Sequence, residues 1–101
     1  MDALQTAVLE EVNEIRINIL KLPPVTELQK GIKGEGDCCP IANTLCIGSD
    51  QMVNVDHYEV YLGKDESLPT SRNFCKFMDE FDGGHAYDDL DADRDAEWKF
   101  A

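Results

Sequence analysis

The sequence predicts an α+β fold in one small domain of 101 residues. Three observations support this class: apolar residues recur at helical spacing near the N-terminus, apolar and polar residues alternate in the middle, and aromatic residues recur at helical spacing after a later proline. We expect an N-terminal amphipathic helix, a short Cys-Pro helix, a β-hairpin, a C-terminal core helix and an acidic tail. The predicted divisions are a helical arm over 1–24, a compact unit over 25–90 and a tail over 91–101.

The first helix is predicted from Asp2 to about Leu22, because its apolar residues follow one another at steps of four and three. The alternating Ile15, Ile17 and Ile19 also fit a strand, but the longer pattern favours a helix. The same spacing is that of a coiled-coil seam, so the stripe either packs in the core or joins two copies in a homodimer. The stripe consists of Val8, Val12, Ile15, Ile19 and Leu22.

Two prolines, Pro23 and Pro24, are expected to end this helix, because proline removes a donor and restricts the residue before it. A second, short helix is predicted over Val25 to Ile32, with Thr26 as its N-cap.

The most distinctive stretch runs from Gly31 to Gly48 and reads GIKGEGDCCPIANTLCIG. Pro40 suits a first helical turn, Ile41 and Leu45 then share one face, and Gly48 is expected to end the helix. Cys39, just before the proline, is interpreted as a cap or a packing residue.

A β-hairpin is predicted next, because apolar residues alternate with polar ones on both sides of Asp56 and His57. The segment from Gly63 to Ser67 is expected to be the exit loop. The alternating residues are Val53, Val55, Tyr58, Val60 and Leu62.

Pro69 is expected to open the last helix, which Gly83 and Gly84 end. Its apolar residues, spaced three and four apart, should contribute most of the core. They are Phe74, Phe77, Met78 and Phe81.

The formal net charge is −12, from 21 acidic and nine basic residues. This balance argues against direct binding of nucleic acid or anionic membranes, and it favours a partner with a basic surface. The N-terminus lacks the cationic start of a secretory signal and no stretch is apolar enough to span a membrane, so we expect a cytoplasmic protein with reduced cysteines.

Acidic residues concentrate after residue 78, together with two aromatic residues near the C-terminus. We expect this set to bind a partner, because local helix stability does not favour acidic residues in the last turn of a helix. The predicted partner-binding residues are Asp79, Glu80, Asp82, Asp88, Asp89, Asp91, Asp93, Asp95, Trp98 and Phe100.

No complete catalytic or metal-binding motif is present, so we expect neither an enzyme nor a cofactor. The cysteines and histidines lack the paired spacing of structural zinc sites. A nucleophilic Cys39 would need His57 or His85 as its base. An EF-hand starting at Asp89 would have Arg94 where the loop needs glycine. The candidate ligands are Cys38, Cys39, Cys46, Cys75, His57 and His85.

Three motifs, Cys39-Pro40-Ile41-Ala42, Leu68-Pro69 and Phe81-Asp82, give residues 25–90 a likeness to a known group. The chain resembles small uncharacterised proteins of actinobacteria and their bacteriophages. This resemblance implies a small, phage-encoded cytoplasmic α+β protein and carries no activity.

Charge, composition and resemblance together favour a non-enzymatic protein-interaction module, a binder or inhibitor of a host protein that acts through an acidic surface and an apolar helix. The alternatives are a nucleic-acid mimic that blocks a DNA-binding protein and a small zinc-binding regulatory protein.

Overall fold

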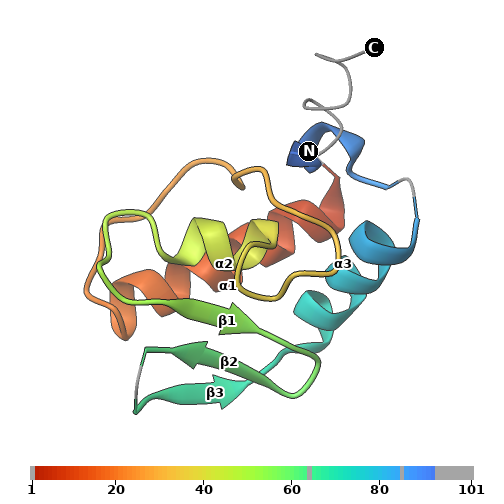
Figure 1. Cartoon of the computed structure of the whole chain (residues 1–101). Coiled ribbons are helices and arrows are strands. Elements are labelled where there is room, and N and C mark those ends of the chain that lie inside the picture. The colour runs from red at the N-terminus through yellow and green to blue at the C-terminus, as the bar shows by residue number, and fades with distance from the viewer. Residues whose placement is uncertain (1, 64, 85, 93–101) are drawn as a thin grey trace.

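The computed structural model describes residues 2–63, 65–84 and 86–92. Helices gather along one side of a small antiparallel sheet, and β3 is its outermost strand (Figure 1). The predicted α+β class is confirmed. The elements in chain order are α1 (Ala3–Asn18), α2 (Pro40–Leu45), β1 (Val53–Val55), β2 (Glu59–Leu62), β3 (Ser67–Pro69), α3 (Arg72–Gly83) and the 3-10 helix η1 (Asp88–Leu90).

The predicted hairpin is confirmed, with β1 and β2 antiparallel and Val55 opposite Val60. Inward residues of both strands are buried, as an alternating pattern requires. The exit loop is confirmed for Gly63, Asp65 and Glu66, which lie outside any strand, but it ends one residue earlier than predicted. The chain then turns back, and Ser67–Pro69 pairs with β2 as a third strand that was not predicted. Three residues are too few to show a periodicity, so β3 left no sequence signal.

The prediction that Pro69 opens the last helix was also wrong. Pro69 is the last residue of β3, an edge strand, where its missing N–H matters little. The helix instead begins after Ser71, whose hydroxyl accepts a hydrogen bond from the Phe74 N–H at 3.1 Å. Serine is a favoured N-cap residue and proline is not, so Ser71 determines where α3 begins.

Helix α1 confirms the helical interpretation over the strand. Asp2 caps it in a reciprocal pair with Gln5. Its fully buried line, however, is Val8, Val12 and Arg16, spaced by four residues. Ile15, which the predicted stripe placed next, is only half buried.

Arg16 is 1% exposed and donates to backbone carbonyls instead of a carboxylate. Its Nη1 donates to the carbonyls of Thr44, Leu45 and Ile47 at 2.9–3.0 Å, and its Nε donates to Pro23 at 3.0 Å. The carbonyls at a helix C-terminus lack partners within the helix and carry partial negative charge. The guanidinium therefore caps α2 from within the core. Burial lowers its pKa, but arginine stays protonated at neutral pH.

The helix predicted over Val25 to Ile32 is absent, and Thr26 caps nothing there: residues 19–30 form no regular element. Side chains satisfy this backbone in place of helical hydrogen bonds. The Asn13 amide bonds both the N–H and the carbonyl of Val25 at 2.9 Å. Thr44 accepts from the N–H of Gln29 at 2.9 Å. The segment is thus fixed between α1 and α2.

One core joins all the elements, and α1 contributes to it with Val8 and Val12 at 0% exposure. The structure places this helix within the compact unit, against α2 and α3, and not on a separate arm. As predicted, α3 supplies the aromatic part of the core through Phe74, Phe77 and Phe81. Among the described residues, no helix combines the length and the apolar character needed to cross a lipid bilayer.

Replacing Arg16 by Met should lower the free energy of unfolding by about 3 kcal/mol, because two buried and two partly buried carbonyls lose a charged donor. The matched control is Arg72→Met, which removes the same charge from an exposed position and should cost less than about 0.5 kcal/mol. Urea unfolding followed by circular dichroism measures both variants. Equal losses would contradict the assigned role of Arg16.

Gly31→Ala should destabilise the protein by at least about 2 kcal/mol, because a Cβ there would meet the backbone of Cys38, Cys39 and Pro40. Gly83→Ala is the control, since a Cβ at that helical position meets nothing within 4 Å. Thermal unfolding of the two variants should differ clearly. A Gly31 variant as stable as the Gly83 variant would show that the loop can relax.

Candidate functional site

The glycine-rich loop before α2 brings three parts of the chain together. Gly31 donates its N–H to Leu90 at 2.8 Å and accepts from the N–H of Ala92 at 2.9 Å, so the C-terminal segment docks beside it. Its missing side chain lets Pro40 approach. The loop therefore connects α2 with the last described residues of the chain.

Cys39 is the N-cap of α2, as interpreted from the sequence. Its Sγ accepts from the N–H of Ala42 at 3.4 Å, and the side chain is 3% exposed. Burial raises the pKa of this thiol, which outweighs the lowering by the backbone N–H groups of Ala42 and Ile41. A protonated, buried thiol is a weak nucleophile, so this geometry is that of a structural cysteine.

Beside the loop, a cavity of about 270 Å³ opens between the end of β1 and α3. Its lining is acidic and includes Glu35, Asp56 and Asp82 together with His57. The N–H groups of Glu59 and Tyr58 donate to the Asp56 carboxylate and lower its pKa. The cavity can attract a cation, and among its described lining residues no nucleophile is paired with a base.

The three acidic residues predicted at the end of α3 each have a partner within the molecule. Asp79 lies 2.6 Å from Nε2 of His57, and Asp82 accepts from the N–H of Gly34 at 2.9 Å. Glu80 accepts from the Tyr87 hydroxyl at 3.1 Å, and burial together with this bond raises the pKa of Tyr87. These contacts give each of the three carboxylates a preferred orientation at the surface.

The remaining predicted partner-binding residues divide in two groups. Asp88 and Asp89 belong to η1, and Asp91 lies 3.7 Å from Nζ of Lys33. The other four lie outside the described residues: Asp93, Asp95, Trp98 and Phe100.

The predicted self-association stripe divides by burial into a buried and a partly exposed part. Val8 and Val12 are fully buried and inaccessible to a second chain. Ile15, Ile19 and Leu22 are half buried, so only the C-terminal part of the stripe reaches the surface.

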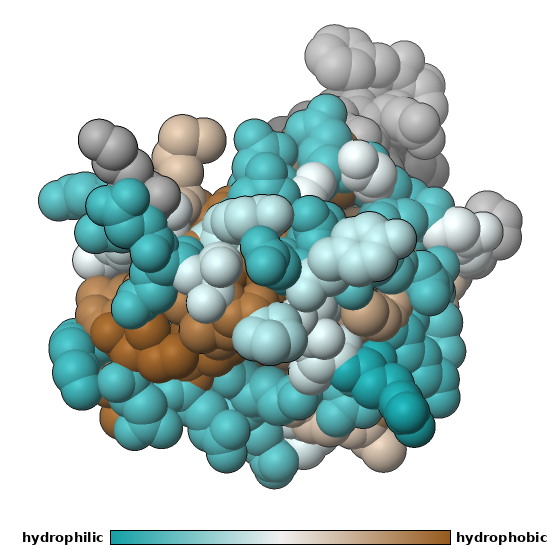
Figure 2. All heavy atoms as spheres, turned by 90° about the horizontal axis from the view of Figure 1, so that it is seen from below, coloured by the Kyte–Doolittle hydropathy of each residue, from teal (hydrophilic) through white to brown (hydrophobic). Residues whose placement is uncertain are grey.

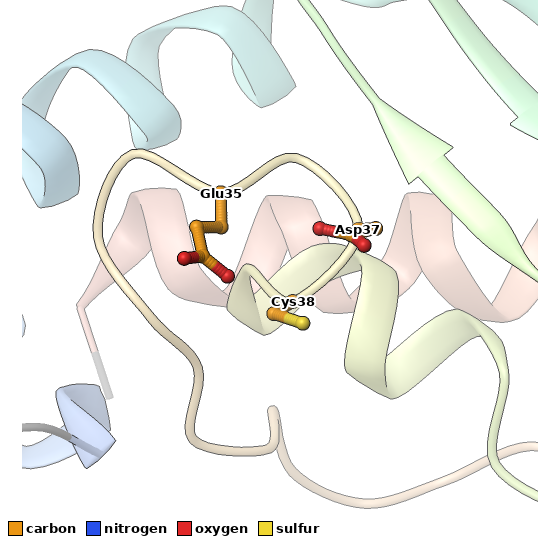
Figure 3. Close-up of side chains that lie close together, drawn as sticks. All are labelled: Glu35, Asp37 and Cys38. Carbon is orange, nitrogen blue, oxygen red and sulfur yellow. The ribbon is translucent and has the colours of Figure 1, made fainter.

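The structure brings together Glu35, Asp37 and Cys38, a grouping the sequence analysis missed. Their ligand atoms lie within 4.8 Å of one another on the loop before α2 (Figure 3). Partial desolvation, with the charges of Asp37 and Glu35, raises the pKa of the Cys38 thiol. One thiol and two carboxylates could hold a cation, but they fall short of the four ligands of a structural zinc site.

A second feature that sequence reasoning missed is the outer face of the sheet. Met52, Tyr58 and Tyr61 are 77%, 83% and 41% exposed. Met52 and Tyr61 line a shallow hollow of about 510 Å³ with Gln51, Asn54 and Gly63. For Tyr61 the signal was in the alternation, since the residue between the inward Val60 and Leu62 must face outward. Tyr58, which the alternating pattern grouped with Val60 and Leu62, instead lies before β2 and is exposed, so that part of the prediction was wrong.

Comparison of the chain with protein-family models, curated proteins and solved structures finds no match.

Protein purified without chelator should contain less than about 0.2 zinc per chain, because three exposed or half-exposed ligands from one loop do not complete a structural site. Elemental analysis of the full chain measures this. Stoichiometric zinc that disappears in Cys38→Ser but persists in Cys75→Ser would contradict the expectation and support a metal-binding role.

Proposed function

We propose that this chain is a non-enzymatic protein-interaction module that binds the basic surface of another protein. The observation that carries the proposal is the charge of its surface. The chain has 21 acidic against nine basic residues, and the fold buries one of the nine, Arg16. The surface therefore carries a large excess of carboxylates, and such a field attracts cationic partners.

The carboxylates of Asp79, Glu80 and Asp82 strengthen the proposal because intramolecular hydrogen bonds orient them. Groups that are already held in place lose less conformational entropy when they bind. A partner would meet part of this acidic surface already ordered.

Hydrophobic side chains at the surface offer a second kind of contact. Ile17 is 46% exposed, and several neighbouring aliphatic side chains are only half buried against the core. On the face seen from the side of β3, a broad hydrophobic area is bordered by hydrophilic atoms (Figure 2). The half-buried aliphatic residues of α1, its C-terminal end and β3 include Ile15, Ile19, Leu20 and Leu68. Protein interfaces combine such apolar areas with a charged rim.

The sequence resemblance to phage proteins would make the partner a host protein that the module binds or inhibits. A nucleic-acid mimic is the second candidate, since the fixed carboxylates of α3 could occupy the phosphate positions of a DNA-binding protein. The two differ in whether DNA competes for the partner.

The full chain, immobilised and exposed to bacterial lysate at about 50 mM salt, should retain a small set of basic proteins. Raising the salt to about 500 mM should release them, because exposed charges are screened. A version ending at Ala92 keeps the strand-like pairing with Gly31 and shows what the last nine residues add. Competition by double-stranded DNA identifies mimicry.

The control is an unrelated acidic protein of the same size and net charge. If both columns retain the same proteins, charge alone explains retention and the proposed module is wrong. Retention that is unchanged at high salt would also contradict a basic surface as the main contact.

A further inference from the structure

The sheet has one face that the described chain leaves uncovered. Inward residues of β1 and β2 are buried, whereas the outward Asn54, Tyr61, Ser67 and Pro69 are all exposed. Asn54 and Ser67 flank Tyr61 as its direct cross-strand partners. Their side chains therefore meet on one surface.

A hollow of about 510 Å³ lies on this surface. Met52 and Tyr61 provide apolar and aromatic walls, and the amides of Gln51 and Asn54 provide polar ones. The Gln51 side chain lies across Gly63, which has the positive φ of 111° and no Cβ to obstruct it. Protein interfaces are enriched in both methionine and tyrosine, so an exposed pair that lines one hollow is suited to binding.

Charge around the hollow indicates what kind of group it receives. Glu59 lies on the same face as Tyr61, and a hydrogen bond to this carboxylate raises the pKa of the Tyr61 phenol. In the sequence, Asp50 precedes the hollow-lining Gln51, and Asp65 and Glu66 follow Gly63, with Lys64 as the one basic residue among them. Asp56 lies elsewhere and lines the cavity beside the glycine-rich loop.

We infer that this sheet face, at the hollow between Met52 and Tyr61, binds an arginine side chain on an exposed segment of the basic partner; the inference rests on the function proposed above. The guanidinium stacks on the Tyr61 ring and pairs with the Glu59 carboxylate, while the arginine stem contacts Met52. The side-chain oxygens of Gln51 and Asn54 accept the remaining N–H donors.

Arginine fits this surface better than lysine does. A planar guanidinium can stack on a ring and donate along its edge at the same time, whereas an ammonium is a compact, strongly hydrated charge. A second copy of this chain fits poorly, because it would bring the same acidic strands against this face and like charges would oppose the contact.

The test is a titration of the isotope-labelled full chain with two peptides of equal length and charge, one with two arginines and one with two lysines. Amide chemical shifts are followed by NMR at about 150 mM salt. The arginine peptide should shift residues 51–54 and 59–63 in a saturable way. It should bind at least about fivefold more tightly than the lysine peptide.

Tyr61→Ala should weaken binding of the arginine peptide at least about fivefold, and Met52→Lys should do so by placing a cation in the hollow. The matched control is Tyr58→Ala. Tyr58 is the most exposed tyrosine but does not line the hollow, so its replacement should leave the affinity unchanged. Met52 is 77% exposed, so its variant tests the site even if Tyr61→Ala impairs folding.

Three results would overturn the inference. They are equal affinity for both peptides, amide shifts at acidic residues throughout the chain instead of at the hollow, or no binding of either peptide. Each leaves the proposed function to be decided by the lysate capture, because a basic partner could use another part of the surface. Capture of a salt-sensitive basic partner whose retention is insensitive to Tyr61→Ala and Met52→Lys would refute the sheet site alone.

Discussion

The buried guanidinium of Arg16 is the interaction on which the arrangement of the helices depends. It donates to carbonyls at the end of α2 and to Pro23 in the segment that follows α1. A buried charge is costly unless hydrogen bonds compensate it, so this contact tolerates little displacement of either partner. It fixes α2 against α1, and with Asn13 it fixes the connecting segment between them. It holds the six-residue α2 together with the buried side chains of Ile41, Ala42 and Leu45.

Gly31 connects the other end of α2 to the C-terminal segment. Its backbone pairs with Leu90 and Ala92, and its lack of a side chain lets the loop pass against Pro40. The stacking of Tyr87 on Phe77, with ring centroids 4.7 Å apart, secures the same C-terminal segment to α3. Residues up to Ala92 thus belong to the compact unit, and they bring the acidic end of α3 close to the glycine loop.

The buried Arg16 and the acidic side chains have different partners. Arg16 donates to backbone carbonyls, whereas Asp79, Asp82 and Glu80 have His57, the Gly34 N–H and Tyr87 as their partners, and Asp91 lies beside Lys33. The fold places the carboxylates of Glu35, Asp56 and Asp82 around the loop cavity, and it places Glu59 beside Tyr61 on the open sheet face.

What the sequence determined by itself was the local structure. Helical periodicity identified α1 and α3, alternation identified the hairpin, and Cys39-Pro40 identified the start of α2, because each signal lies within a few neighbouring residues. Tertiary structure decided the rest. An arginine in a helix normally indicates a solvent-facing position, yet Arg16 is buried because carbonyls about 30 residues away accept hydrogen bonds from its guanidinium. The segment at Val25 is not helical because Asn13 bonds its backbone, and β3 forms only because β2 is there to pair with it. The same limit applied to the candidate sites. The acidic residues were evident in the sequence, but the pairing of His57 with Asp79 and the hollow beside Tyr61 were not. Both depend on contacts between distant segments, which periodicity and composition do not encode.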